Sequence, residues 1–286
     1  MIPTYAKPFT YQVPWKSNSL HFGGHRGTQR GLGFEFRGNV PLIDYPDARR
    51  VDLRQTLRDP YDQVQVKLFN QDNTTPIFAV CDMSSSMQFK GDVRKLDLAK
   101  EIAASIAYST YETSDTFAFV GYHQEVIEEM ALGLSHHIHQ SFEVIEQLST
   151  YKKMRVGADG ILEVPQYLSP SKALVFWISD FHMPLSLIEH AMNAMSAHHV
   201  VPVVLWDDQE YKKLPKFGFG NMIDPETGLN RTLLFRKALT ESFAVAYAIR
   251  KTKLEALFSS FDTQAIYISG KYDPEIMSHY FEQVMG

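Results

Sequence analysis

The chain alternates short apolar runs with segments whose apolar residues recur at helical spacing. Apolar runs that predict buried strands lie at 76–82, 116–123, 172–180, 200–207 and 264–269. Apolar positions three and four residues apart predict helices over 93–112, 136–148, 184–199, 239–261 and 274–284. Strands that are apolar on both faces and alternate with helices are typical of a mostly parallel sheet covered by helices on both sides. We therefore predict a doubly wound α/β domain over residues 73–286.

Three stretches depart from this alternation. Residues 1–72 are rich in Gly, Pro and aromatic residues, and their one short helical patch is 48–57. This composition predicts an N-terminal arm of extended segments, packed on the larger domain. Residues 125–132 are expected to pair with the strand at 116–123. Residues 208–231 contain several Gly and Pro and are predicted to form a long loop.

Composition and charge exclude several classes of protein. The 286 residues carry a net charge of −5, which argues against nucleic acid as the main partner. The longest apolar run, 243–249, is far shorter than the ~20 residues of a membrane helix, so no membrane insertion is expected. The first 17 residues lack the apolar stretch of a signal peptide. The lone Cys81 excludes an internal disulfide and suits a reducing compartment, so a cytoplasmic protein is expected.

Candidate chemistry follows the first apolar strand. Asp82, Ser84 and Ser86 form a D-x-S-x-S motif there, and Asp180 ends the strand at 172–180. One carboxylate and two hydroxyls on a tight loop offer oxygen ligands to one side of a divalent metal ion. The carboxyl ends of parallel strands meet at one sheet edge, which can bring Asp180 toward the loop. The alternative is a Ser-rich turn that only caps the next helix.

This motif after an apolar strand resembles the metal-ion-dependent adhesion site of von Willebrand factor A domains. Four further segments resemble the domain-of-unknown-function 58 family, a likeness that runs from about residue 25 to the C-terminus. They are 31–38 (GLGFEFRG), 45–58 (YPDARRVDLRQTLR), 205–215 (LWDDQEYKKLP) and 224–228 (DPETG). The resemblance implies a von Willebrand factor A-like fold and a non-enzymatic adaptor. Such proteins act beside MoxR-type AAA+ ATPases in the chaperone-like maturation of a client protein, including metal or cofactor insertion. One member serves methanol dehydrogenase.

The resemblance also implies roles for particular residues. Asp82, Ser84 and Ser86 match the family's first metal loop, and Asp180 matches its acid after the fourth strand. The usual threonine is replaced by Ala158, whose methyl group cannot bind a metal. Asp159 beside it is a candidate substitute ligand, or else caps the following helix. The implied cofactor is therefore Mg²⁺, or another divalent cation such as Ca²⁺ or Mn²⁺, bound weakly or with help from a partner's acidic side chain.

Two other functions stay open from the sequence. A metal-dependent hydrolase would use Asp82 and Asp180 to activate water, with Asp159 and His182 as the further candidate ligands. A degenerate A domain would bind its partner by shape and need no metal. Ala158 favours this second alternative.

Overall fold

A computed structural model describes most of the chain. The described residues are 2–13, 15, 25–31, 35–44, 46–152, 155–207, 210, 218–223, 230–235 and 237–285. They divide into two compact units. The larger comprises the described residues within 1–11, 76–112 and 116–286, and the smaller those within 12–75 and 113–115.

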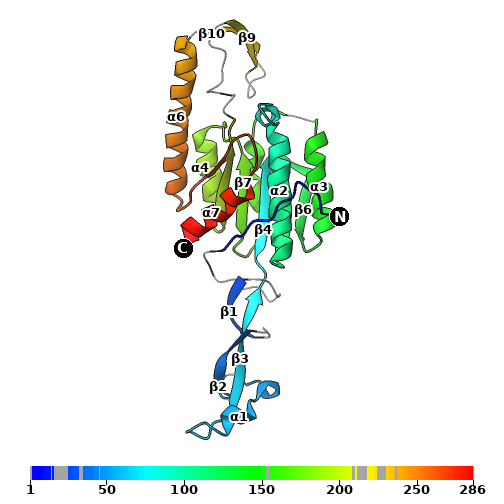
Figure 1. The fold of residues 1–286 in the computed structure, drawn as a ribbon, viewed down its shortest axis with the longest axis vertical. Helices are drawn as coiled ribbons and strands as arrows, with labels where there is room; N and C mark the ends of the chain where they lie inside the picture. Colours follow the sequence, from blue (N-terminus) through cyan, green and yellow to red (C-terminus); the bar gives the residue numbers. More distant parts are fainter. Residues whose placement is uncertain are drawn as a thin grey trace. The chain divides into compact units, whose positions relative to one another are not determined.

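The larger unit is built on a six-stranded sheet of order β11-β8-β7-β4-β5-β6 (Figure 1). Its strands are β4 (Pro76–Asp82), β5 (Thr116–Tyr122), β6 (Val126–Ser135), β7 (Leu174–Ser179), β8 (His199–Leu205) and β11 (Ile266–Ile268). All neighbouring pairs are parallel except β5 and β6, which are antiparallel. The central strands β4 and β7 are buried along their whole length, as a sheet covered on both faces requires. The predicted α/β fold, a doubly wound and mostly parallel sheet, is confirmed.

Helices cover both faces of this sheet. They are α2 (Lys95–Glu112), α3 (Ile138–Thr150), α4 (Leu185–Ala194), α6 (Lys237–Ser259) and α7 (Pro274–Met285), with short 3-10 helices η2 (Ser85–Gln88), η3 (Asp159–Leu162) and η4 (Val164–Tyr167). Side chains of β4 alternate between the faces, and Phe78 and Val80 share one core cluster with Ile188 of α4 and Phe258 of α6. Among the described residues, no helix is long and apolar enough to cross a membrane.

The predicted loop over 208–231 is wrong in part, because it contains strands. β9 (Gly218–Ile223) and β10 (Asn230–Phe235) pair antiparallel, from Gly218 opposite Phe235 to Ile223 opposite Asn230. Gly and Pro are as typical of hairpin connections as of irregular loops, so their number does not distinguish the two. The rest of this stretch, including the family-like segment 224–228, lies outside the described residues.

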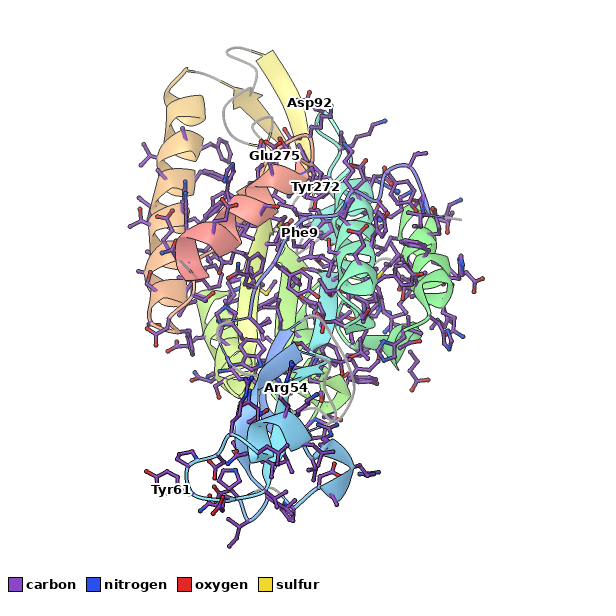
Figure 2. All side chains as sticks on the ribbon, turned by 60° about the horizontal axis from the view of Figure 1, so that its bottom comes forward. Phe9, Arg54, Tyr61, Asp92, Tyr272 and Glu275 are labelled. Atoms are coloured by element: carbon purple, nitrogen blue, oxygen red, sulfur yellow. The ribbon has the colours of Figure 1, made fainter. Side chains whose placement is uncertain are left out.

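Residues 1–72 were predicted to form an N-terminal arm, but the described residues within 1–11 belong to the larger unit. Main-chain N–H groups of Lys7 and Phe9 donate to the hydroxyls of Ser105 and Ser109 on α2, at 3.0 and 2.8 Å. The Phe9 ring, labelled in Figure 2, is buried against Phe176 of β7, with 6.0 Å between ring centroids. Phe176 is on the sheet face opposite α4, because its neighbours Val175 and Trp177 share the core cluster that contains Ile188 of α4. The chain passes from the smaller to the larger unit between Thr75 and Pro76, close to the predicted boundary after residue 72.

Phe9→Ala is expected to destabilise the larger unit by about 3 kcal/mol, because it removes a buried aromatic side chain and leaves a cavity. The measurement is the urea unfolding midpoint, with Tyr111→Ala as the control, since Tyr111 is 53% exposed. Equal midpoints for Phe9→Ala and the wild type would contradict the anchoring of residues 2–11.

The smaller unit is an antiparallel sheet of order β1-β3-β2 with short helices. Its elements are β1 (His25–Gly31), β2 (Glu35–Pro41), η1 (Ala48–Arg50), α1 (Leu53–Thr56) and β3 (Gln65–Asn73). Asp52 caps α1 by accepting from the main-chain N–H groups of Arg54 and Gln55. The predicted helical patch at 48–57 is therefore two short helical turns, interrupted at Val51 and Asp52.

Candidate functional site

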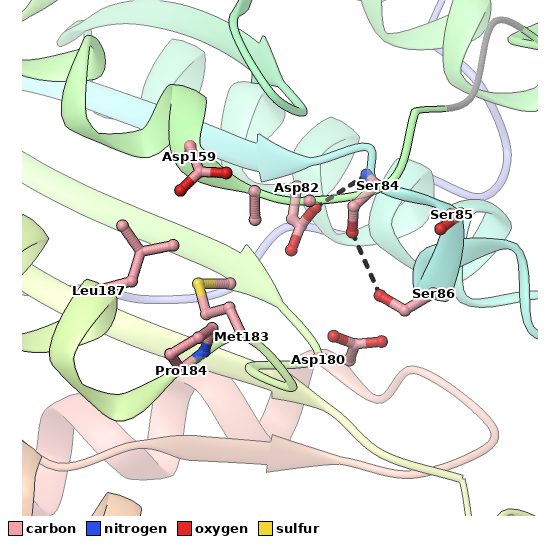
Figure 3. Close-up of a pocket in the computed structure, with 11 residues that line it drawn as sticks. Asp82, Ser84, Ser85, Ser86, Asp159, Asp180, Met183, Pro184 and Leu187 are labelled. Atoms are coloured by element: carbon pink, nitrogen blue, oxygen red, sulfur yellow. Dashed lines mark hydrogen bonds between the residues drawn. The ribbon is translucent and has the colours of Figure 1, made fainter. Parts of the chain in front are cut away.

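The predicted site residues surround one cavity at the carboxyl edge of the sheet. Strands β4 and β7 are parallel neighbours whose register places Cys81 opposite Ile178, so Asp82 is level with Ser179, and Asp180 follows one residue later at the same edge. The cavity has a volume of about 180 Å³. Its lining includes Asp82, Ser84, Ser86, Ala158, Asp159 and Asp180, with Met183, Pro184 and Leu187 forming an apolar wall (Figure 3). The cavity lies between β4 and β7, where the strand order of the sheet reverses. Ligands usually bind at this position in doubly wound sheets.

The carboxylate of Asp82 is held from two sides. Its Oδ1 accepts the main-chain N–H of Ser84 at 2.8 Å, and its Oδ2 accepts the Ser179 hydroxyl at 2.6 Å. Only 1% of Asp82 is exposed. These two contacts fix the orientation of the carboxylate and leave each oxygen a further lone pair.

The two motif hydroxyls converge. Ser84 Oγ lies 3.1 Å from Ser86 Oγ, beside Asp82 (Figure 3). Two oxygens bound at right angles to Mg²⁺ at 2.0–2.1 Å lie roughly 3 Å apart, so this spacing suits neighbouring positions of an octahedron. Oxygen donors of this kind are those that Mg²⁺ prefers. The donor set of Asp82, Ser84 and Ser86 therefore fits a hard divalent cation.

The turn at 157–159, which also lines the cavity, supplies fewer donors. Ala158 is buried there and offers only a methyl group, while Asp159 is exposed. The main chain at Gly160 packs closely against the main chain of Glu125. A Cβ on Gly160 would lie only 2.5 Å from Glu125, so a larger residue does not fit there. Among the described residues, no three His, Cys, Asp or Glu side chains gather closely enough to hold a metal ion by themselves. A cation held by Asp82, Ser84 and Ser86 would keep coordination positions open to water or to a ligand from a partner.

A buried lysine lies behind Asp180. Lys95 Nζ donates to Asp180 Oδ2 at 2.9 Å and to Glu210 Oε1 at 2.6 Å, and its side chain is only 3% exposed. The His182 ring also approaches both carboxylates, with Nε2 at 4.0 Å from Asp180 Oδ2 and 3.8 Å from Glu210 Oε1. Asp180 Oδ1 accepts the His182 main-chain N–H at 3.3 Å.

These contacts give the two buried aspartates opposite electrostatic characters. Burial, and then the nearby charge of Asp180, raise the pKa of Asp82 to about 6. Burial would also raise the pKa of Asp180, but the Lys95 ammonium and His182 outweigh it and hold this pKa below its usual range. For Lys95, burial opposes the charged form, but the carboxylates of Asp180 and Glu210 raise its pKa overall. At pH 7 the cavity therefore presents carboxylates, one of which has a built-in counter-ion.

The sequence did not predict Lys95 as part of this region, and it indicated segment 205–215 as family-like without placing it beside the site. Trp206 Nε1 donates to the main-chain oxygen of Asp180 at 2.7 Å, and Asp207 Oδ2 accepts the Asp92 main-chain N–H at 3.2 Å. A signal for Lys95 was available, since it lies four residues before Ala99 on the apolar face of the predicted helix. A charge on an apolar stripe is normally paired when buried.

Comparisons with known proteins agree with the expected family. Residues 46–253 match the family described as protein of unknown function DUF58. The uncharacterized protein Rv1480 of Mycobacterium tuberculosis is 24% identical over 245 residues, which cover 84% of this chain and 75% of that protein.

Two solved structures from Bacteroides are also similar. The conserved hypothetical protein BatB of Bacteroides thetaiotaomicron is 12% identical, with a TM-score of 0.47 over 73% of this chain and 98% of that one. An aerotolerance-related membrane protein of Bacteroides fragilis is 12% identical, with a TM-score of 0.42 over 74% of this chain and 98% of that one. Because the family match spans well over half of the residues, the chain belongs to the DUF58 family of proteins of unknown function.

Proposed function

We propose that the larger unit is a protein-interaction domain that binds an acidic side chain of a partner through a divalent cation in the cavity. The observation that carries this proposal is the convergence of Asp82, Ser84 and Ser86 at the edge of a buried sheet, with the two hydroxyls 3.1 Å apart. These donors come from one side of the cavity only, so a carboxylate from outside has both room and a coordination position.

Each residue has a distinct role in this proposal. Asp82, Ser84 and Ser86 hold one side of the ion, and Asp180 contributes through water. Asp159 lines the same cavity and is a further candidate ligand in place of the missing hydroxyl at Ala158. Bound Mg²⁺, Mn²⁺ or Ca²⁺ supplies a concentrated positive charge, which the partner's carboxylate neutralises. The wall of Met183, Pro184 and Leu187 excludes water from one side and packs against apolar atoms beside that carboxylate.

We further propose that the protein is a non-enzymatic adaptor. Its partners would be a MoxR-type AAA+ ATPase and a client protein whose maturation or metal or cofactor insertion it assists, as the family resemblance suggests. No nucleic acid takes part in this proposal. The single cysteine, Cys81, is a buried free thiol, which accords with a reducing compartment, and we place the activity in the cytoplasm.

Ser84→Ala is expected to weaken Mn²⁺ binding by about tenfold or more, the loss usual even for residues that only orient metal ligands. The measurement is the electron paramagnetic resonance signal of free Mn²⁺ during titration of the purified full chain. Ser85→Ala is the matched control, because Ser85 lies between the motif serines and lines the same cavity. Equal affinities of the wild type and Ser84→Ala would refute the assigned donor set.

One alternative has a specific observation in its favour. Ala158 and the buried Lys95 both reduce the attraction of the cavity for a cation, as a degenerate A domain without metal would require. Such a domain would bind its partner equally well with Mg²⁺ and with EDTA.

A further inference from the structure

The feature that the proposed function leaves unused is the buried chain of charges behind the cavity. Lys95 Nζ lies between two carboxylates, 2.9 Å from Asp180 and 2.6 Å from Glu210. Asp180 lines the cavity, whereas Glu210 follows β8 and takes no part in its lining. The lysine therefore touches the site through Asp180 alone and stands outside the proposed set of cation ligands.

Because Lys95 and its two carboxylate partners are largely buried, their charges act strongly on an ion in the cavity. The side chains of Lys95 and Asp180 are 3% and 1% exposed, and that of Glu210 is 17% exposed. Charges in such a setting are poorly screened by solvent and salt, so each acts on an ion in the cavity over several ångströms. A resident ammonium next to Asp180 opposes the entry of a second cation, and Glu210 offsets part of that opposition.

We propose that Lys95 is a positioning residue that sets the cation affinity of the cavity, with Glu210 as the counter-charge that moderates it. This inference rests on the proposed function, since it concerns the same cation. Lys95 holds the Asp180 carboxylate in place and weakens its pull on an incoming ion. The free cavity is thereby a weak cation site, and the added carboxylate of a partner supplies the missing negative charge.

The same contact ties the site to a distant part of the chain. Glu210 lies in the family-like segment 205–215, at the beginning of the connection that carries the β9–β10 hairpin. Asp207 Oδ2 accepts from Asp92, three residues before Lys95, so this connection is attached to the start of α2 at two points. If a partner that binds this segment displaced Glu210, Lys95 would keep its contact with Asp180 but lose the one with Glu210. The cation affinity of the cavity would then fall.

The test compares variants that change the local charge in opposite directions. Glu210→Gln removes a negative charge near the site and is expected to weaken Mn²⁺ binding roughly fivefold or more. Lys95→Met/Glu210→Gln removes one charge of each sign, and the lost ammonium is the one that contacts Asp180. This double variant is therefore expected to bind Mn²⁺ at least as tightly as the wild type, and more tightly than Glu210→Gln. The readout is again free Mn²⁺ by electron paramagnetic resonance, on full-length protein.

The control is Lys251→Met/Glu255→Gln, which removes an exposed ion pair of the same residue types on α6 and is expected to leave Mn²⁺ binding unchanged. If the double variant at Lys95 and Glu210 binds more weakly than Glu210→Gln, Lys95 only locates Asp180, and the electrostatic role is overturned while the cation site stands. If neither the wild type nor any variant binds Mn²⁺ at millimolar concentration, the proposed cation site fails, and this inference fails with it.

Discussion

Asp82→Asn is expected to yield a folded protein that binds divalent cations far more weakly than the wild type and yet is more stable. The Asp82 carboxylate is 1% exposed, and burial followed by the charge of Asp180 raises its pKa to about 6. Its pKa in the unfolded chain is about 3.9, so ionisation at pH 7 costs the folded state up to about 3 kcal/mol. The amide is neutral and avoids this cost. Its oxygen still accepts from Ser84, but its NH₂ group requires Ser179 to reorient, so we expect a net gain of about 1–3 kcal/mol.

The pH dependence of this gain has a definite sign. A carboxyl group whose pKa is raised on folding leaves the folded state with more bound protons between about pH 4 and pH 6, so its contribution to stability falls as pH rises through that interval. The advantage of Asp82→Asn should therefore be small at pH 4 and full above pH 6. Urea unfolding of both proteins in EDTA at several pH values measures it. Asp159→Asn serves as the control for stability, since Asp159 is exposed.

Mn²⁺ affinity and stability report on two different properties of Asp82, its role as a cation ligand and its electrostatic cost to the folded state. Mn²⁺ affinity is expected to fall about 100-fold, because a charged cation ligand becomes neutral. A variant that is less stable than the wild type at pH 7 would contradict the electrostatic description of Asp82. Unchanged Mn²⁺ affinity would contradict its role as a ligand.

Lys95→Met is expected to lower the free energy of unfolding by about 3–5 kcal/mol, the usual cost of removing one partner of a buried ion pair. The substitution leaves Asp180 and Glu210 without the ammonium that both contact. The measurement is urea unfolding in EDTA at pH 7. Lys251→Met removes an exposed ion pair with Glu255 and is expected to change stability by less than about 0.5 kcal/mol.

A second substitution keeps this prediction testable if Lys95→Met does not fold. Lys95→Met/Asp180→Asn removes the buried charge of Asp180 together with its counter-ion, and we expect it to recover much of the lost stability. A Lys95→Met protein as stable as the wild type would show that the buried pair does not hold this edge of the sheet together.

The sequence was sufficient to predict the parts of the site that depend on neighbouring residues. The apolar run 76–82 forms β4 with its predicted bounds, and the D-x-S-x-S motif begins at the last residue of this strand, Asp82. The approach of Asp180 to Asp82 was also predictable, because the carboxyl ends of parallel strands share one edge. Both residues line the same cavity in the structure.

The unpredicted parts depend on contacts between distant segments. Lys95 and Glu210 are 115 residues apart, and nothing in the local pattern around either residue names the other. The attachment of Phe9 to α2 and β7 is equally non-local, since the N-terminal residues carry no periodicity that indicates where they pack. The β9–β10 hairpin was missed because Gly and Pro mark both loops and turns.

The most direct test of the central claim is the affinity of the purified protein for a purified MoxR-type AAA+ ATPase from the same organism. It would be measured with Mg²⁺, with EDTA, and with Asp82→Asn in Mg²⁺. The proposed function predicts binding to the wild type in Mg²⁺ only, with loss in EDTA and in the variant. Equal binding under all three conditions would show that the domain recognises its partner without the cation and that Asp82 is not the residue that mediates it.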